Sequence, residues 1–265
     1  MRYKSGFVIA AVSSGSGKTT VTNGLLRAFK NRGFKVAPFK TGPDFIDTQF
    51  HKVAAGMESV NLDVFMSDEQ HVKSLFQRYS AGSDVRIVEG VMGLFDGYDK
   101  RKGSAAHIAE LTGLPVVLVI NAASSAYSLA AVLSGFKNFD KRIKIAGVIF
   151  NNVASENHQR LLKSAAEDAG VTLLGCLKRN PYMTMPSRHL GLSLGDDNVI
   201  ESFIDRASDA VKVGIDLDLL LSLTQIDKDE KSDDTHVADK CHLISSPSRK
   251  IALAYDEAFN FVYTE

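Results

Sequence analysis

The chain has 265 residues, and its 31 basic and 31 acidic side chains give a formal net charge of zero. This balance gives no support for a nucleic-acid partner, which favours a basic surface. The first apolar run, residues 7–12, is too short and too soon broken for a signal peptide or a membrane span. Cys176 and Cys241 form neither a disulfide framework nor a metal cluster. We therefore expect no membrane association and a reducing cytoplasm.

Short apolar runs alternate with helical stretches along the chain. Runs without polar alternation are typical of strands buried on both faces of a parallel sheet. The order favours an α/β fold with helices on both faces of a mostly parallel sheet. A capping box, Ser67 with Gln70, indicates the start of one helix. The predicted strands are 7–12, 34–37, 85–88, 116–120, 143–150 and 171–174, and the predicted helices are 18–31, 67–79, 104–112, 125–136, 156–169 and a helical region over 196–223.

The first strand runs directly into a Ser/Gly-rich turn, then Gly-Lys-Thr-Thr, then a helix. Glycines let backbone N–H groups point at a polyphosphate, and the helix adds its positive end. Lys18 is expected at the β- and γ-phosphates and the Thr19 hydroxyl at Mg²⁺. The usual motif has a glycine where this chain has Val12, so the loop is a variant. The fold class is thus a three-layer P-loop NTPase, with the nucleotide at Ser14, Gly15, Ser16, Gly17, Lys18, Thr19 and Thr20; the alternative is a turn without a ligand.

Three acidic segments follow predicted strands, at residues 40–47 and 89–97 and in a loop at 61–63. Mg²⁺ prefers hard oxygen ligands and keeps several waters, so one or two carboxylates beside Thr19 suffice. Glu89 stands at a strand end, in the position of a Walker B acid. Asp47 is the second candidate, although it could instead cap the next helix. The predicted metal ligands are Thr19, Asp47 and Glu89.

Lys40 follows the second predicted strand and is expected to be a second cation near the γ-phosphate. Its alternative is a solvated surface lysine. Asp44 and Asp96 are expected either to touch the second substrate or to orient Lys40. The predicted catalytic set is therefore Lys18, Lys40, Asp44 and Asp96.

Residues 14–20, 40–47, 61–63 and 89–97, together with 186–192, resemble the cobyrinic acid a,c-diamide synthase family in content, order and spacing. The resemblance covers about residues 6–225. It implies a dethiobiotin-synthetase-like domain with ATP and Mg²⁺ as cofactors. It also implies a ligase reaction of cobalamin biosynthesis, in which ATP phosphorylates a substrate carboxylate, ammonia attacks the acyl phosphate, and the c and a acetates of a corrinoid become amides. The family usually has glycine where this chain has Ala11.

The resemblance also implies roles for residues outside the phosphate loop. Asn151 matches the residue that reads adenine, which an amide can do by donating and accepting hydrogen bonds; the alternative is a turn residue. The corrinoid would be contacted by Asp44, Asp96, Arg188 and His189, because an arginine can bind a carboxylate with two hydrogen bonds.

The resemblance divides the chain into an amidoligase domain at 1–226, a polar linker at 227–249 and a segment at 250–265. That last segment resembles only the first strand and turn of a glutamine amidotransferase domain. The cysteine and histidine of that glutaminase are absent, so we expect no glutamine hydrolysis by this chain. Ammonia would come from solution or from a glutaminase domain or partner. The sequence leaves open whether the protein forms a homodimer.

Three alternatives remain at this stage. The same chemistry could act on nickel-sirohydrochlorin, which is a polyacid of similar size. A nucleotide-switch ATPase of the partition type shares the fold, but such proteins place a lysine where this chain has Ser13, and residues 40–47 have no role in a switch. The chain could also be a nonfunctional remnant or a pure binding protein.

Overall fold

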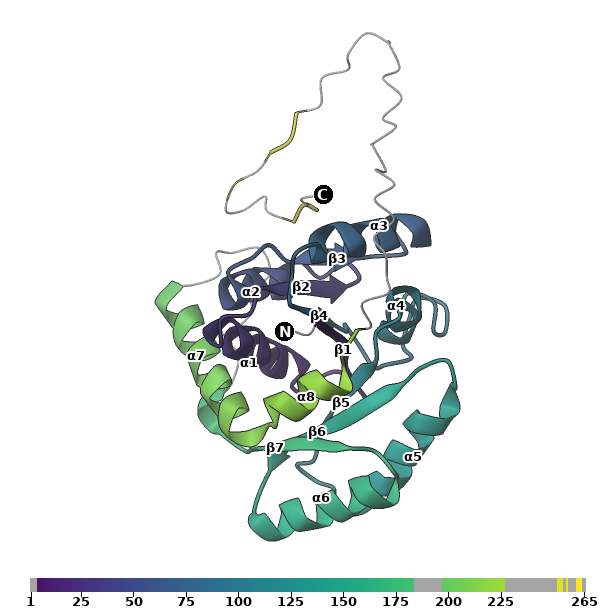
Figure 1. The fold of residues 1–265 in the computed structure, drawn as a ribbon, viewed down its shortest axis with the longest axis vertical. Helices are drawn as coiled ribbons and strands as arrows, with labels where there is room; N and C mark the ends of the chain where they lie inside the picture. The colour runs from purple at the N-terminus through teal and green to yellow at the C-terminus, as the bar shows by residue number, and fades with distance from the viewer. Residues whose placement is uncertain (1–3, 184–196, 227–251, 255, 257–260, 264–265) are drawn as a thin grey trace.

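The computed structural model describes residues 4–183, 197–226, 252–254, 256 and 261–263. Seven parallel strands form one sheet in the order β3-β2-β4-β1-β5-β6-β7 (Figure 1). The strand β1 lies at its centre, and the chain builds outward on both sides of it. Such a switch point places a ligand-binding crevice at the carboxyl ends of the strands. The strands are β1 (Ser5–Ala11), β2 (Val36–Thr41), β3 (Val60–Leu62), β4 (Val85–Glu89), β5 (Val116–Asn121), β6 (Ile145–Val153) and β7 (Leu173–Lys178).

Helices cover both faces of this sheet, which confirms the predicted three-layer α/β fold. One core lies under α1, α2, α7 and α8, and a second lies under α3, α4, α5 and α6. Successive side chains of β1 feed opposite cores, Val8 one and Ile9 the other, which is why this strand is a continuous apolar run. The helices are α1 (Lys18–Asn31), α2 (Phe45–Ala55), α3 (Glu69–Ser80), α4 (Ala105–Thr112), α5 (Leu129–Phe139), α6 (Glu156–Asp168), α7 (Asp197–Gly214) and α8 (Leu217–Leu223), with a 3₁₀ turn at Pro181–Met183.

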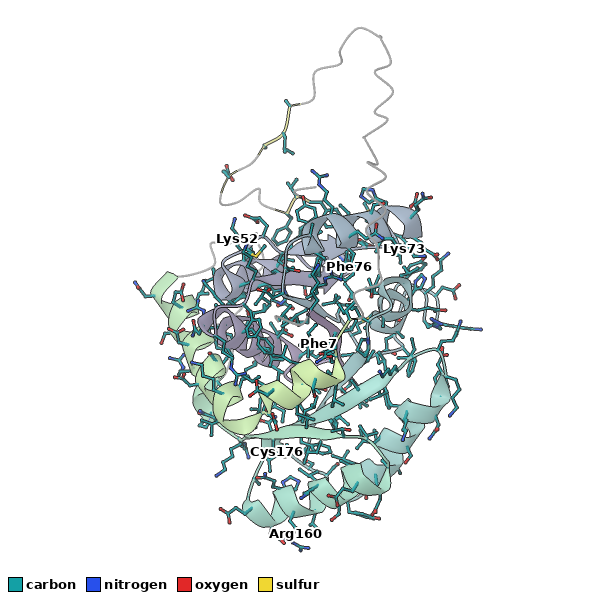
Figure 2. All side chains as sticks on the ribbon, in the orientation of Figure 1. Phe7, Lys52, Lys73, Phe76, Arg160 and Cys176 are labelled. Atoms are coloured by element: carbon teal, nitrogen blue, oxygen red, sulfur yellow. The ribbon has the colours of Figure 1, made fainter. Side chains whose placement is uncertain are left out.

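Packing within one helical layer is tight where α1 meets α7. A Cβ atom on Gly24 would lie 2.7 Å from the backbone oxygen of Ala207, so the two helices approach through a position without a side chain. Figure 2 shows Phe7 inside the molecule, whereas Lys52, Lys73 and Arg160 lie at its periphery. The close contact between α1 and α7 helps to fix α1, the helix that follows the phosphate loop.

Several predicted elements differ from those observed. The second strand runs to Thr41, so Lys40 lies within it and not after it. Asn61 belongs to the short strand β3, not to a loop. The predicted capping box is wrong, because Asp68 caps α3 by accepting from the His71 N–H. The Ser67 hydroxyl instead donates to the Asp63 backbone oxygen, since that residue still belongs to the preceding turn.

Other observed element boundaries also differ from the predicted ones. A full helix, α2, occupies residues for which no element had been assigned, and α5 begins at Leu129, not at 125. The helical region at the end is two helices, α7 and α8, separated at Ile215 and Asp216. Residues 186–192, the linker at 227–249 and most of 250–265 fall outside the described residues, so the predicted domain division remains a prediction.

Candidate nucleotide-binding site

The phosphate loop joins β1 to α1 through residues 12–17. Gly15 and Gly17 have φ angles of 75° and 93°, in the left-handed region that favours glycine. A Cβ atom on Gly17 would also lie 2.1 Å from the Asn151 Nδ2 atom. The first turn of α1 has no acidic residue and no side-chain cap. Its first N–H groups therefore lack a side-chain acceptor, which is the arrangement that suits a phosphate.

Lys18 begins α1 and is largely buried. Its Nζ atom lies 3.4 Å from the Ser13 backbone oxygen, which also accepts from the Ser16 hydroxyl at 2.9 Å. Burial lowers the pKa of Lys18. It outweighs the nearby carboxylates, which act to raise that pKa and among which Glu89 has the largest effect. A bound phosphate would give this ammonium group a direct anionic partner.

The three predicted metal ligands come together from three elements. The Thr19 hydroxyl on α1 donates to Glu89 Oε1 at the end of β4, at 2.7 Å, and lies 3.2 Å from Asp47 Oδ2 on α2. Both carboxylates are buried, with 0% of Glu89 and 2% of Asp47 exposed. The cluster provides several hard oxygen atoms around one point. The assignment of these residues to a metal remains a prediction.

Lys40 lies inside this cluster and is 1% exposed, so the alternative of a solvated surface lysine is wrong. Its Nζ atom is 2.5 Å from Asp47 Oδ2, 3.0 Å from Glu89 Oε1 and 3.4 Å from Asp44 Oδ2. Burial by itself would lower the pKa of Lys40, but the carboxylates, Glu89 first, outweigh it and raise the pKa. The ammonium group therefore stays charged.

The two buried carboxylates have pKa values that are shifted in opposite directions. Burial would raise the pKa of Glu89, yet Lys40 and the hydrogen bonds from His51 and Thr19 outweigh it and lower that pKa. The pKa of Asp47 is raised, by burial and then by the neighbouring charge of Glu89. Glu89 is therefore firmly ionised, and Asp47 is the acid of the pair that takes up a proton first.

Asp44 is the N-cap residue of α2. Its Oδ1 atom accepts from the backbone N–H groups of Ile46 and Asp47, each at 3.1 Å. The alternative that Asp47 caps this helix is therefore wrong, because Asp44 is the cap. Burial would raise the pKa of Asp44, but Lys40 and the backbone N–H of Asp47 lower it. Asp44 is thus tied to Lys40, as one of its two predicted roles requires.

Asp96 lies in the loop that follows β4. Its Oδ2 atom accepts from the Gly93 N–H at 3.1 Å and so closes the turn. Its negative charge acts to raise the pKa of Lys18. Among the described residues, the carboxylates in ion pairs with Lys40 are Asp44, Asp47 and Glu89. The structure therefore gives Asp96 a place near the phosphate loop, and contact with a second substrate remains a prediction.

Sequence reasoning missed His51, which is fully buried. Its Nε2 atom lies 2.6 Å from Glu89 Oε2, and its Nδ1 atom lies 3.2 Å from the Ser59 hydroxyl. An ionised carboxylate only accepts, so Nε2 carries the hydrogen of this bond. His51 follows Asp47 by four residues on α2, which places both on one face. Had α2 been predicted, this spacing would have indicated that His51 lies beside Asp47.

Asn151 lies at the end of β6, beside the phosphate loop. Its Nδ2 atom donates to the Ser16 backbone oxygen at 3.1 Å, a contact that Gly17 makes room for. It belongs to the strand and not to a simple turn. Its role at adenine remains a prediction. The other two predicted substrate contacts, Arg188 and His189, lie outside the described residues.

Among the described residues, no group of three or more His, Cys, Asp or Glu side chains is arranged to hold a metal ion by itself. A magnesium site needs fewer protein ligands, because water and phosphate supply the rest. None of the helices in the same part of the chain is long and apolar enough to cross a membrane.

The parallel sheet and the glycine-rich loop ahead of α1 define a P-loop nucleotide-binding protein. The family profile described as "CobQ/CobB/MinD/ParA nucleotide binding domain" matches residues 7–192, and the chain belongs to this family. Nucleotide binding follows from this membership and from the loop.

Curated relatives include two enzymes with similar names. A cobyrinate a,c-diamide synthase of Listeria innocua is 43% identical over 263 residues, which cover 97% of this chain and 57% of the relative. A hydrogenobyrinate a,c-diamide synthase of Brucella ovis is 44% identical over 260 residues, covering 97% and 58%. The chain thus spans under three fifths of the length of these relatives.

Proposed function

We propose that this protein is an ATP-dependent amidoligase that converts the a and c acetate carboxylates of cobyrinic acid, or of its metal-free counterpart, to amides. The observation that carries the proposal is the cluster of Lys40, Asp47 and Glu89 at the phosphate loop. Burial of a charge costs on the order of several kcal/mol per ion, and ion pairing must offset this cost. Such clusters gather where a protein handles the charge of a ligand. The names of the two relatives supply the substrate class.

The residues present fit Mg²⁺. A cation, the Lys40 ammonium, already lies between Asp47 Oδ2 and Glu89 Oε1, with the Thr19 hydroxyl beside them. This oxygen set is the kind that magnesium prefers. Thr19, Asp47 and Glu89 would hold the ion, which when bound would neutralise charge on the transferring phosphoryl group. The backbone of residues 14–20 would bind the ATP phosphates, and Asn151 would contact adenine.

In the proposed reaction, a carboxylate oxygen of the acceptor bonds to the γ-phosphorus of ATP, and the bond from that phosphorus to the ADP oxygen breaks. Ammonia then bonds to the acyl carbon, a proton is lost, and phosphate leaves. Catalysis of this kind depends on positioning and on charge neutralisation. Lys18 and Lys40 supply two positive charges for it. Asp44, Asp96, Arg188 and His189 are the proposed contacts of the acceptor.

The proposal includes the setting of the reaction. Ammonia reaches the site from solution or from a glutaminase domain or partner protein, because glutamine hydrolysis needs a nucleophile that the described cluster does not contain. We expect the reaction in the cytoplasm, where ATP is available. The acceptor is a polyacidic corrinoid, and no nucleic acid takes part.

The test is ADP release from Mg²⁺-ATP with cobyrinic acid, with either ammonium or glutamine as the nitrogen source, and mass spectrometry of the corrinoid. We expect turnover and diamide formation with ammonium and none with glutamine. No corrinoid-dependent ADP with either source would overturn the proposal. Turnover with nickel-sirohydrochlorin alone would identify a different acceptor, and stimulation of hydrolysis by DNA or a partner protein would favour a nucleotide switch.

A further inference from the structure

The carboxyl-terminal segment of the chain contacts the helix that carries Asp47. The Phe45 ring, in the first turn of α2, stacks on Phe261, with centroids 5.4 Å apart and planes 9° from parallel. It also stacks on Tyr263, at 4.9 Å and 24°. Figure 1 draws this last segment in yellow near α2 and β3. One ring of the nucleotide domain therefore receives two rings from a segment more than 200 positions away in the sequence.

A hydrogen bond fixes the same segment at a second point. The Tyr263 hydroxyl donates to Asp63 Oδ2 at 2.7 Å. Asp63 is only 4% exposed, and its other oxygen accepts from the Phe65 N–H at 2.8 Å. One oxygen of the carboxylate is thus held by the turn after β3, and the other accepts from Tyr263. A fixed acceptor of this kind selects a donor at one position, which a ring stack alone does not.

Both contact points lie at one edge of the nucleotide site, formed by the start of α2 and the end of β3, which we call the rim. Phe45 follows Asp44, the cap of α2 that pairs with Lys40. Asp63 directly follows β3, which pairs with β2 at Lys40 and Asn61. The rim that receives the segment is therefore built from the same strand ends and helix start that hold the buried charges.

We propose that Phe45 and Asp63 form a docking site for residues 261–263 of the same chain. The occupant is recognised by two aromatic rings and one phenol hydroxyl, and docking holds the carboxyl-terminal region at the rim of the nucleotide site. Polypeptide that follows residue 263 in a longer chain would begin there, beside α2. This inference does not depend on the amidation reaction, because it concerns only where the segment binds.

The chain contains no tryptophan, so Phe261→Trp introduces a single fluorescent reporter. Phe261 is 49% exposed, which leaves room for the larger ring. In the full chain we expect acrylamide to quench this tryptophan less than it quenches a free peptide of residues 252–265 with the same substitution. Adding Phe45→Ala should raise the quenching constant by about twofold or more, because the stack is lost.

Phe65→Ala is the matched control. Phe65 is also an aromatic residue near this rim, but it is 67% exposed and its ring packs edge-on against Tyr98. It should leave the quenching constant unchanged. Tyr263→Phe removes only the hydroxyl and should raise quenching by a smaller amount, and it decides the matter if Phe45→Ala fails to fold. Quenching equal to that of the free peptide, or unaffected by both Phe45→Ala and Tyr263→Phe, would overturn the docking site. No nucleotide is used, so this result is separate from that of the amidation assay.

Discussion

Two of the charged side-chain clusters among the described residues differ in burial. The first lies between β2, β4 and α2, where Glu89 is fully buried. The second joins α4 to the connection after α5, where the Arg142 side chain is 59% exposed. The buried cluster consists of Lys40, Asp44, Asp47, His51 and Glu89, and the surface cluster consists of Arg101, Glu110, Asp140 and Arg142.

The difference in burial indicates which of the two clusters is the candidate for a functional role. Surface ion pairs are common, and each contributes about 0–1 kcal/mol, so the second cluster needs no function to explain it. Buried ions lose much hydration energy, and a chain keeps them only where compensation is close. The buried cluster also touches Thr19 of the phosphate loop. Three predictions about the free energy of unfolding test this contrast, in order of decreasing effect, and a fourth concerns the reactivity of a buried thiol.

Loss of the central cation should have the largest effect. Lys40→Met leaves Asp47 and Glu89 buried without their ammonium partner, which should lower the free energy of unfolding by about 3–5 kcal/mol. Urea denaturation measures this change. The matched control is Lys52→Met, because Lys52 pairs with Glu58 at 2.6 Å but both side chains are about half exposed. That variant should lose less than about 1 kcal/mol. Equal losses in the two variants would contradict the contrast.

Loss of His51 should have an intermediate effect. His51→Ala leaves Glu89 Oε2 without its donor and should lower the free energy of unfolding by about 1–3 kcal/mol, with a further loss from the cavity. His51→Gln keeps an amide donor and should recover part of that loss. Urea denaturation of both variants measures it. A His51→Ala variant as stable as the parent would show that this hydrogen bond does not hold Glu89.

The surface cluster should respond weakly. Glu110→Gln removes one of the two carboxylates that pair with Arg101 and Arg142 and should change the free energy of unfolding by less than about 1 kcal/mol. Because the Glu110 and Arg142 side chains are exposed to solvent, the small effect should shrink further in 1 M salt. Thermal and urea unfolding at low and high salt measure both. A loss as large as that of Lys40→Met would remove the distinction between the clusters.

Cys176 tests what burial does to an acid that lacks a cation. Burial raises the pKa of its thiol from 9.0 to about 11, whereas Lys40 reverses this effect at Glu89. The raised pKa keeps the folded thiol protonated at pH 8. In a Cys241→Ser background, iodoacetamide should therefore react about a hundredfold more slowly, or slower still, in the native protein than in urea. Equal rates would show that the thiol is accessible and ionisable.

Local signals in the sequence predicted much of the fold. The first strand, the phosphate loop and the helix from Lys18 to Asn31 were predicted because an apolar run, glycines and a helical pattern follow directly in the chain. The short strand β3 was missed, since three residues with a polar Asn61 in the middle carry no apolar run. The helix α2 was missed because it buries Asp47, Thr48 and His51, which break the apolar periodicity of its inner face.

The sequence predicted Thr19, Asp47 and Glu89 as one group, but neither their arrangement nor the presence of His51 beside them. Thr19, Asp47 and Glu89 could be proposed together because each follows a recognisable strand or loop. That Lys40 is buried among them could not, because burial depends on how β2, β4 and α2 pack. His51 has its partner Glu89 38 residues away, and no local pattern joins them. The docking of Tyr263 on Asp63 spans 200 residues and is likewise a property of the tertiary structure.

The most direct test of the central claim replaces one carboxylate in each cluster by its amide. Glu89→Gln and Glu110→Gln are chemically the same change, one at the phosphate loop and one on the surface. Corrinoid-dependent ADP release with ammonium should fall by about a hundredfold or more in folded Glu89→Gln and stay within about twofold of the parent in Glu110→Gln. A folded Glu89→Gln protein with the activity of the parent would contradict the assignment of the buried cluster to catalysis.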